Sequence, residues 1–329
     1  MNYTTNILFD NFNTLKNKQT LYKKHLYFQK IILFQKGNSL DKSRRNFTQL
    51  MTLSALLATL PSFAKSSQND TLAPALFMGH GTPLNAFNSN HFTDEWDKLS
   101  KIIKKPKAIL VVSAHWETTF SAVSTNLNPP TIYDFYGFPD FMYNIKYEAK
   151  GAPEIATSIA TSFNEEIFKD PNQGLDHGAW SVLLRLFPNA DVPVFQFSLA
   201  QSMSPAEHFR LAQEMRKLRE QGVMILGSGN IVHNIPSARN DSINGTRHIV
   251  HEWAKNFDDL VVSKINQRDY KSLANYEKIS KDAKMAVPTP EHFLPLLYVL
   301  GTTNKKEKAQ YFAEGFQEGS FSMRSVLFS

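Results

Sequence analysis

Four short runs of apolar residues constrain the fold of this chain more than any other feature of its sequence. They cover residues 75–78, 108–112, 192–197 and 223–226, and a weaker candidate covers 121–124. The runs lack the polar alternation of a strand that has one face in water, so they are predicted to be strands buried on both faces.

Helical patterns separate these runs. Apolar residues at helical spacing predict helices over 92–104, 152–168, 245–265, 270–283 and 291–300. A further helix is expected between Ser204, which opens a capping box with Glu207, and Gly222. Strands that alternate with helices indicate an α/β fold with a central, mostly parallel sheet flanked by helices. No repeat or low-complexity linker interrupts residues 65–329, which are therefore predicted to form a single catalytic domain.

The first 64 residues are predicted to be an N-terminal extension with a signal peptide. Arg44 and Arg45 precede an apolar stretch over residues 50–60, and Ser62 and Ala64 place small residues at a cleavage site. The paired arginines favour export by the Tat machinery to the periplasm, with a retained arm in the cytoplasm as the alternative. The apolar stretch is shorter than the roughly 20 residues of a membrane span, so stable membrane insertion is not expected.

The charge of the chain resides in this N-terminal extension. The whole sequence has a net charge of +6, but residues 1–64 hold nine Lys/Arg and two Asp, or +7, which leaves −1 for the remainder. A near-neutral domain lacks the clustered basic face that nucleic-acid binding requires, so no nucleic-acid partner is expected. The chain contains 0 cysteines, which excludes disulfides, thiolate metal ligands and cysteine nucleophiles.

Histidines follow three of the apolar runs. His80 and His115 come shortly after the first and second runs, and His233 comes shortly after the last. Ligands of open α/β sheets bind at the carboxyl ends of the strands, so these three imidazoles are candidates for one metal site. Imidazole suits first-row divalent ions such as Fe(II) and Zn(II). Taken singly, each histidine is also explained as a hydrogen-bonded loop residue.

Two further histidines stand at the starts of predicted helices. His292 opens a late helix, where it is either a helix cap or a partner of the substrate. His177 follows Asp176 and precedes an apolar helix, which suits a proton-transfer group or a capping residue. The remaining histidines of the domain lie on polar helical faces and are expected to be solvated: His91, His208, His248 and His251.

Taken together, six segments resemble the DODA-type (LigB-like) extradiol ring-cleavage dioxygenases, particularly the bacterial 4,5-DOPA dioxygenase group. The segments occur in order at residues 79–83, 112–117, 133–139, 175–180, 227–234 and 291–293. They span nearly the whole predicted domain, and the resemblance implies the LigB-type α/β fold. By position, it implies that His80, His115 and His233 hold the metal, with His292 as a further ligand or near neighbour. It also implies that His177 is the acid/base residue beside the metal.

The resemblance implies an enzyme that opens the ring of a DOPA-like catechol with O2 at a single metal ion. The motif positions offer only histidines, whereas a better-known extradiol branch combines two histidines with a carboxylate. Such a set accommodates Zn(II) as well as Fe(II). Because zinc has no redox chemistry, activity is expected with Fe(II), and Zn(II) is expected as an alternative bound ion. Tyr133, Phe135 and Tyr136 are expected to wall the substrate ring, although a structural aromatic turn explains them equally well.

Two other functions remain open at this point. Three histidines and a water form a hydrolytic zinc site in some enzymes, so a zinc-dependent hydrolase is one alternative. A non-catalytic binding protein of the same fold is the other. The sequence leaves open which catechol is bound, which ring bond is cleaved, the oligomeric state and the true start of translation.

Overall fold

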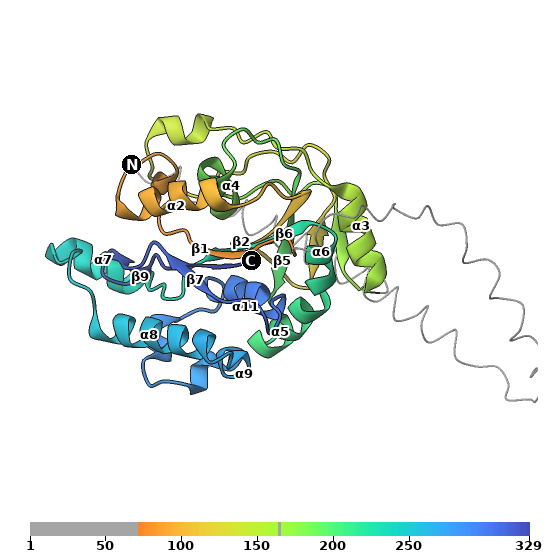
Figure 1. Cartoon of the computed structure of the whole chain (residues 1–329). Coiled ribbons are helices and arrows are strands. Elements are labelled where there is room, and N and C mark those ends of the chain that lie inside the picture. Colours follow the sequence, from red (N-terminus) through yellow and green to blue (C-terminus); the bar gives the residue numbers. More distant parts are fainter. Residues whose placement is uncertain (1–71, 164–165) are drawn as a thin grey trace, which may run out of the picture. The chain divides into compact units, whose positions relative to one another are not determined.

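An eight-stranded sheet forms the centre of the chain (Figure 1). The computed structural model describes residues 72–163 and 166–329, so the extension and Tat signal predicted over 1–64 lie outside the described residues. The strands of this sheet are β1 Ala75–Gly79, β2 Ala108–Thr118, β3 Ala122–Ser124, β4 Phe168–Asp170, β5 Val194–Ala200, β6 Val223–Gly229, β7 Gln310–Phe312 and β10 Ser325–Phe328. A separate two-stranded sheet pairs β8 Phe316–Gln317 with β9 Phe321–Ser322.

The sheet has a parallel centre and antiparallel contacts toward its edges. The strand order is β4-β3-β5-β2-β6-β1-β10-β7, and the four central strands β5, β2, β6 and β1 are parallel to one another. Strand β3 is antiparallel to β5, while β10 and β7 add an antiparallel edge next to β1. The predicted α/β fold with a mostly parallel sheet is therefore confirmed, and the C-terminal antiparallel strands are an addition.

Helices cover both faces of this sheet. The α-helices are α2 His91–Ile102, α3 Pro153–Ser162, α4 His177–Leu186, α5 Pro205–Glu214, α6 Arg216–Glu220, α7 Ile235–Asn244, α8 Glu252–Asn266, α9 Tyr270–Leu273, α10 Ala283–Ala286 and α11 Leu294–Gly301. Short 3-10 helices are η1 Pro83–Ala86, η2 Asp140–Asn144 and η3 Tyr276–Lys278. Figure 1 shows α2 and α4 on one side of the sheet, with α5, α8 and α11 on the other.

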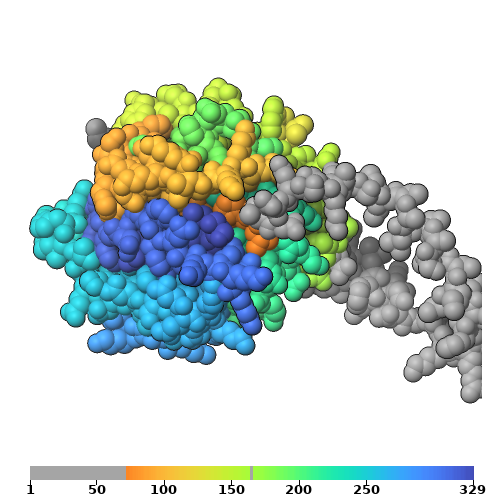
Figure 2. Space-filling view, in the orientation of Figure 1, coloured from red at the N-terminus to blue at the C-terminus, as the bar shows by residue number. Residues whose placement is uncertain are grey.

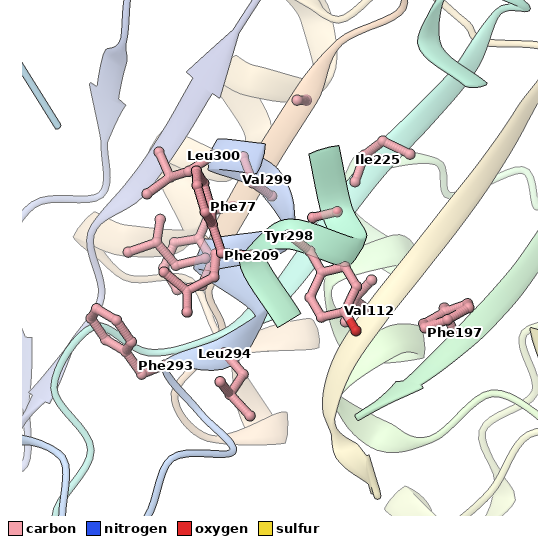
Figure 3. Packing of buried hydrophobic residues seen from close by; sticks show 14 of the residues in the cluster. Phe77, Val112, Phe197, Phe209, Ile225, Phe293, Leu294, Tyr298, Val299 and Leu300 are labelled. Atoms are coloured by element: carbon pink, nitrogen blue, oxygen red, sulfur yellow. The ribbon is translucent and has the colours of Figure 1, made fainter. Parts of the chain in front are cut away.

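Alternate residues of each central strand enter two different cores. In β1, Leu76 and Met78 pack into the core beneath α2 and α4, whereas Phe77 packs into the core beneath α11. Figure 3 shows this second core, which includes Phe77 and Ile225 of the sheet together with Tyr298 and Val299 of α11. Each fully buried side chain of this size stabilises the fold by about 1.5–3 kcal/mol. Burial on both faces explains why the strands appear in the sequence as uninterrupted apolar runs.

On the face of the molecule that Figure 2 shows, the C-terminal residues lie between two other parts of the chain. In the space-filling view of Figure 2, the dark-blue C-terminal residues lie between the orange start of the described chain and the light-blue region of α8. Within the described residues, no helix combines the length and the apolar character needed to cross a membrane.

Four local predictions were wrong. The helix expected over 152–168 ends as α3 at Ser162, and Phe168 begins strand β4 because it pairs with β3. The helix expected over 245–265 begins only at Glu252, because Gly245 adopts a left-handed conformation and ends α7. The helix expected over 270–283 is broken into α9, η3 and the start of α10. His208 is not solvated but buried, and its Nδ1 lies 2.9 Å from the hydroxyl of Tyr298, because α5 turns that face toward α11.

Candidate active site

Five histidines gather at the carboxyl ends of the parallel strands. His80 directly follows β1, His115 lies in the last part of β2, and His233 follows β6 after a short loop. His177 is the first residue of α4, and His292 lies two residues before α11. The ring centroids of His80 lie 5.1 Å from His115 and 5.3 Å from His292, and those of His115 and His177 are 3.8 Å apart. The structure thus brings all five sequence-predicted histidines into one cluster.

Within this cluster, His292 connects two groups of potential ligands. The ligand atoms of His80, His115 and His292 all lie within 4.8 Å of one another, as do those of His233, Glu291 and His292. The ring of His233 stacks on that of His292, with centroids 3.4 Å apart and planes 9° apart. His292 is therefore in the group with His80 and His115, while His233 is connected to that group through its contact with His292. Which of the four bind a metal stays a prediction.

Hydrogen bonds hold the outer nitrogens of two of these rings. The hydroxyl of Ser228 donates to the carbonyl of Gly178 at 2.6 Å and lies 2.9 Å from Nδ1 of His80. A hydroxyl has only one proton to donate, so it accepts from Nδ1 of His80. Nδ1 of His292 lies 3.1 Å from a carboxylate oxygen of Glu291, which also only accepts. In both rings the proton is therefore on Nδ1, and Nε2 keeps a free lone pair.

These free nitrogens are arranged as a cation would require. Nε2 of His80 and Nε2 of His115 face each other at 3.3 Å. Burial, reinforced by the neighbouring histidines, holds the pKa of His80 and of His292 well below the ordinary value of imidazole. The same causes lower the pKa of His115 to about 3, and that of His233 also falls to about 3. Four neutral imidazoles, two of which have the outer nitrogen held by a protein group, form a donor set that suits a metal ion.

Local sequence explains how β2 and α4 approach so closely. The pairing register of β2 with β5 shifts between Val112 and Glu117, and such irregularities commonly re-aim side chains near active sites. On the other side, a side chain at Gly178 would lie 2.7 Å from the ring of His115. Only glycine allows this contact. Gly229 serves a similar purpose, since a Cβ there would lie 2.2 Å from the carbonyl oxygen of His292.

A buried carboxylate sets the start of α4. Asp176 caps the helix by accepting from the backbone N–H of Ala179 at 3.0 Å, and it also accepts from Ser113 at 2.6 Å and from Gln196 at 3.0 Å. Burial, with the nearby charge of Asp134, raises the pKa of Asp176. These bonds connect three elements and thereby place His177 next to His115.

Asp134 contacts His177 twice. Its Oδ1 accepts the backbone N–H of His177 at 2.9 Å, and its Oδ2 lies 2.9 Å from Nδ1 of the ring. That ring nitrogen is buried and forms no well-aligned hydrogen bond, so the second contact is an electrostatic one. Burial alone would raise the pKa of Asp134, but its contacts with His177 and His115 bring that pKa below its usual value.

The three aromatic residues expected around the substrate are placed differently from one another. Phe135 lies edge-on to His177, with ring centroids 5.6 Å apart, and packs near Trp180. Tyr133 donates its hydroxyl to the carbonyl of Ile145, and Tyr136 is 92% exposed. Phe135 therefore adjoins the histidine cluster, Tyr133 helps to hold its own loop, and the substrate role of all three stays a prediction.

The part of the chain that holds the histidine cluster also matches known proteins. The family model described as the catalytic LigB subunit of aromatic ring-opening dioxygenase matches residues 75–324. The chain belongs to the LigB family of aromatic ring-opening dioxygenases. The resemblance detected in the six sequence segments is thereby confirmed, as is the expectation of an extradiol ring-opening oxidoreductase.

Relatives of this LigB protein include one from a bacterium and one from a plant. A 4,5-DOPA dioxygenase extradiol from Escherichia coli (strain K12) is 37% identical over 78% of this chain and 95% of the relative. A protein of the same description from Beta vulgaris is 38% identical over 79% of this chain and 98% of the relative. A crystal structure of an uncharacterized protein from Escherichia coli K12 aligns with a TM-score of 0.67 and 34% identity, covering 78% of this chain and 100% of the other.

Sequence reasoning missed the polar groups that surround the histidines. Asp134 lies in one of the six segments, but nothing in the sequence connects it to His177, which is 43 positions away. Ser228 lies in another, 148 positions from His80. Ser228 could have been found from its position just after the strand predicted over 223–226, whereas Asp134 lies in a loop and had no comparable signal.

Proposed function

We propose that this LigB-family enzyme opens the ring of a catechol of the DOPA type, using a divalent metal at the histidine cluster and His177 as its acid/base residue. The observation that carries the proposal is the pair of facing Nε2 atoms of His80 and His115 at 3.3 Å, in a set of four neutral imidazoles. The names of the relatives support the substrate class.

His80, His115 and His292 would hold the metal, with His233 as the fourth ligand. The outer nitrogens of His80 and His292 are held by Ser228 and Glu291, and that of His115 lies 3.7 Å from Asp134, which leaves the inner nitrogens of these three rings to bind the ion. Fe(II), the ion proposed for activity, would supply a chelating centre for the two catechol oxygens and the redox chemistry that O2 requires. Zn(II) would fit the same nitrogens without that redox chemistry.

His177 would move the proton of the substrate hydroxyl. Its ring lies against that of His115, so a catechol bound beside His115 would place its oxygen within reach of His177. When the ring gains that proton, the carboxylate of Asp134 at 2.9 Å would stabilise the resulting positive charge. The bond from Asp134 to the backbone of His177 would keep the first turn of α4 in place during the transfer.

Phe135 would form one wall of the substrate site. Its edge-on contact with His177 and its packing near Trp180 leave an apolar surface beside the acid/base residue. Such a surface would orient the catechol ring and exclude water from the reacting atoms.

The test is anaerobic loading with Fe(II), followed by measurement of O2 consumption with a panel of catechols that includes DOPA, caffeate and protocatechuate. We expect O2 uptake and a ring-opened product with at least one DOPA-like catechol. Ester or amide hydrolysis by the zinc form without O2 uptake would support the hydrolase alternative. Tight catechol binding without turnover by any metal form would support the non-catalytic alternative.

We also propose that the Tat machinery exports the protein to the periplasm. The order of paired arginines, apolar stretch and small residues over positions 44–64 supports this destination. Replacing Arg44 and Arg45 by lysine should leave the protein in the cytoplasmic fraction of a Tat-competent bacterium. Equal distribution of the wild type and the double variant would contradict export by this route.

A further inference from the structure

A second group of potential ligands lies on the outer side of His115. The ligand atoms of His115, Asp134 and His177 all lie within 4.8 Å of one another, separately from the group that contains His80 and His292. Oδ2 of Asp134 lies 2.9 Å from Nδ1 of His177 and 3.7 Å from Nδ1 of His115. Two imidazoles and one carboxylate form a set that binds first-row divalent ions in many proteins.

An unpartnered nitrogen points to a ligand in this group. The side chain of His177 is only 9% exposed, and its buried Nδ1 forms no well-aligned hydrogen bond. The carboxylate beside it is close enough for a hydrogen bond but lies out of line with the ring N–H direction. Within the described residues, the ion-pair contacts of Asp134 are with His115 and His177, and none is with lysine or arginine.

The spacing of these atoms suits one ion. Zinc binds imidazole nitrogen and carboxylate oxygen at about 2.0–2.2 Å in a tetrahedral arrangement, which places neighbouring ligand atoms about 3.4 Å apart. The separations of 2.9 and 3.7 Å lie on either side of that value. Small side-chain rotations would therefore place the three atoms around one cation.

We propose that His177, Asp134 and His115 form a second, inhibitory site for a divalent cation such as Zn²⁺. A neutral imidazole has one free lone pair, so His115 can serve either this site or the inner one. A cation at the second site also occupies His177. Its binding removes the acid/base residue and weakens the inner site at the same time. The inhibition rests on the proposed function, whereas the binding site itself does not.

The experiment titrates the metal-free full-length protein with Co²⁺, followed by its visible absorption, and repeats the titration with Zn²⁺ by calorimetry. We expect two binding phases in the wild type. Asp134→Asn and His177→Gln should each remove the weaker phase or raise its Kd at least about 10-fold, and leave the tighter phase in place. In parallel, Zn²⁺ beyond one equivalent should inhibit the Fe(II)-loaded wild type and inhibit Asp134→Asn at least about 10-fold less strongly.

Asp241→Asn is the matched control. It removes the carboxylate from another His–Asp contact, in which Nε2 of His251 lies 2.7 Å from Asp241, outside the cluster of five histidines. This variant should keep both phases.

A single binding phase in the wild type, or two unchanged phases in both Asp134→Asn and His177→Gln, would overturn the second site. The second site would also be overturned if Asp241→Asn lost the weaker phase too. That result would mean that the weaker phase comes from His–Asp contacts elsewhere in the protein. If no catechol is opened by any form, the proposed function fails, but the Co²⁺ phases still decide the second site.

Discussion

Two polar clusters at opposite ends of β1 differ in how completely their groups are paired. At the amino end, the guanidinium of Arg219, which is 0% exposed, forms an ion pair with Glu307. It also donates to the carbonyl oxygens of Ala73 at 2.7 Å, Thr302 at 2.9 Å and Phe328 at 3.4 Å. Its donors are thus taken up by the chain ends and helices that meet there, as expected of a buried charge with a structural role.

At the carboxyl end of the same strand lies the cluster of five histidines, in which some polar atoms have no hydrogen-bond partner, and we call it the open cluster. Nε2 of His80 faces another nitrogen, and Nδ1 of His177 has no hydrogen bond. His80 and His177 are buried, as Arg219 is, so the burial of these side chains does not account for the difference. The structural cluster thus satisfies its polar atoms internally, whereas the site for ligands keeps some of them available.

The largest effect is expected at the open cluster, for His177→Gln. Loss of the acid/base group should lower kcat by about 10²–10⁴-fold while KM changes little, since the catechol would still be held by the metal and Phe135. Steady-state O2 uptake by the Fe(II) form measures both constants. A kcat within 3-fold of wild type, roughly the scatter of such assays, would remove His177 from the proposed mechanism.

At the paired cluster, formed by Arg219 and Glu307, a substitution should change the stability of the fold and not metal binding. Glu307→Gln leaves Arg219 buried without its charged partner, which should lower the free energy of unfolding by about 3–5 kcal/mol. Urea denaturation of the metal-free protein measures this loss. Co²⁺ binding by the folded fraction should be unchanged, and a weakened metal site in this variant would show that the two clusters are coupled.

Acid should lower the free energy of unfolding of the metal-free protein through the histidines of the open cluster. His115 and His233 have a pKa of about 3 in the folded protein, against about 6.5 in an unfolded chain. Their unfolded forms therefore bind more protons below pH 6.5, so their contribution to stability is present above that pH and is lost as the pH falls toward 3. Urea midpoints of the metal-free protein across this range should fall, and His115→Asn should show a shallower fall. Parallel slopes in both proteins would mean that His115 does not titrate as proposed.

The smallest effect is expected for Ser228→Ala. Without the hydroxyl that accepts from Nδ1 of His80, the ring can adopt the other tautomer, and metal affinity should fall by about 10–100-fold. Competition with a coloured chelator measures the affinity. Ser198→Ala is the control, because its hydroxyl is equally buried but accepts from the backbone of Ala122 at 2.8 Å. Equal losses in the two variants would assign the effect to packing alone.

Much of the fold could be predicted because the relevant patterns are short-range. The runs that became β1, β2, β5 and β6 are apolar without alternation, and the capping box at Ser204 and Glu207 is present as predicted. The strands β7 and β10 were not predicted, because their pairing with each other and with β1 depends on contacts between distant segments. The broken helix after Tyr270 shows the same limit, since propensity alone does not reveal where tertiary packing ends a turn.

The candidate site was predictable in its residue types but not in its arrangement. Position after a buried strand indicated His80, His115 and His233. Position at a helix start indicated His177 and His292, and the family resemblance made their roles more specific. The stacking of His233 on His292, and the bond that fixes the proton of His80 on Nδ1, are properties of the folded chain. No local pattern encodes them, because each joins residues that lie far apart in the sequence.

The amino-acid sequence by itself determined that buried strands would carry histidines to one edge of an α/β sheet, since burial and strand direction follow from neighbouring residues. Only the tertiary structure decided which nitrogens face each other and which carboxylate lies beside His177. The physical reason is that hydrogen-bond partners and proton positions depend on distances of a few ångströms between elements, and packing of the whole sheet with its helices sets those distances.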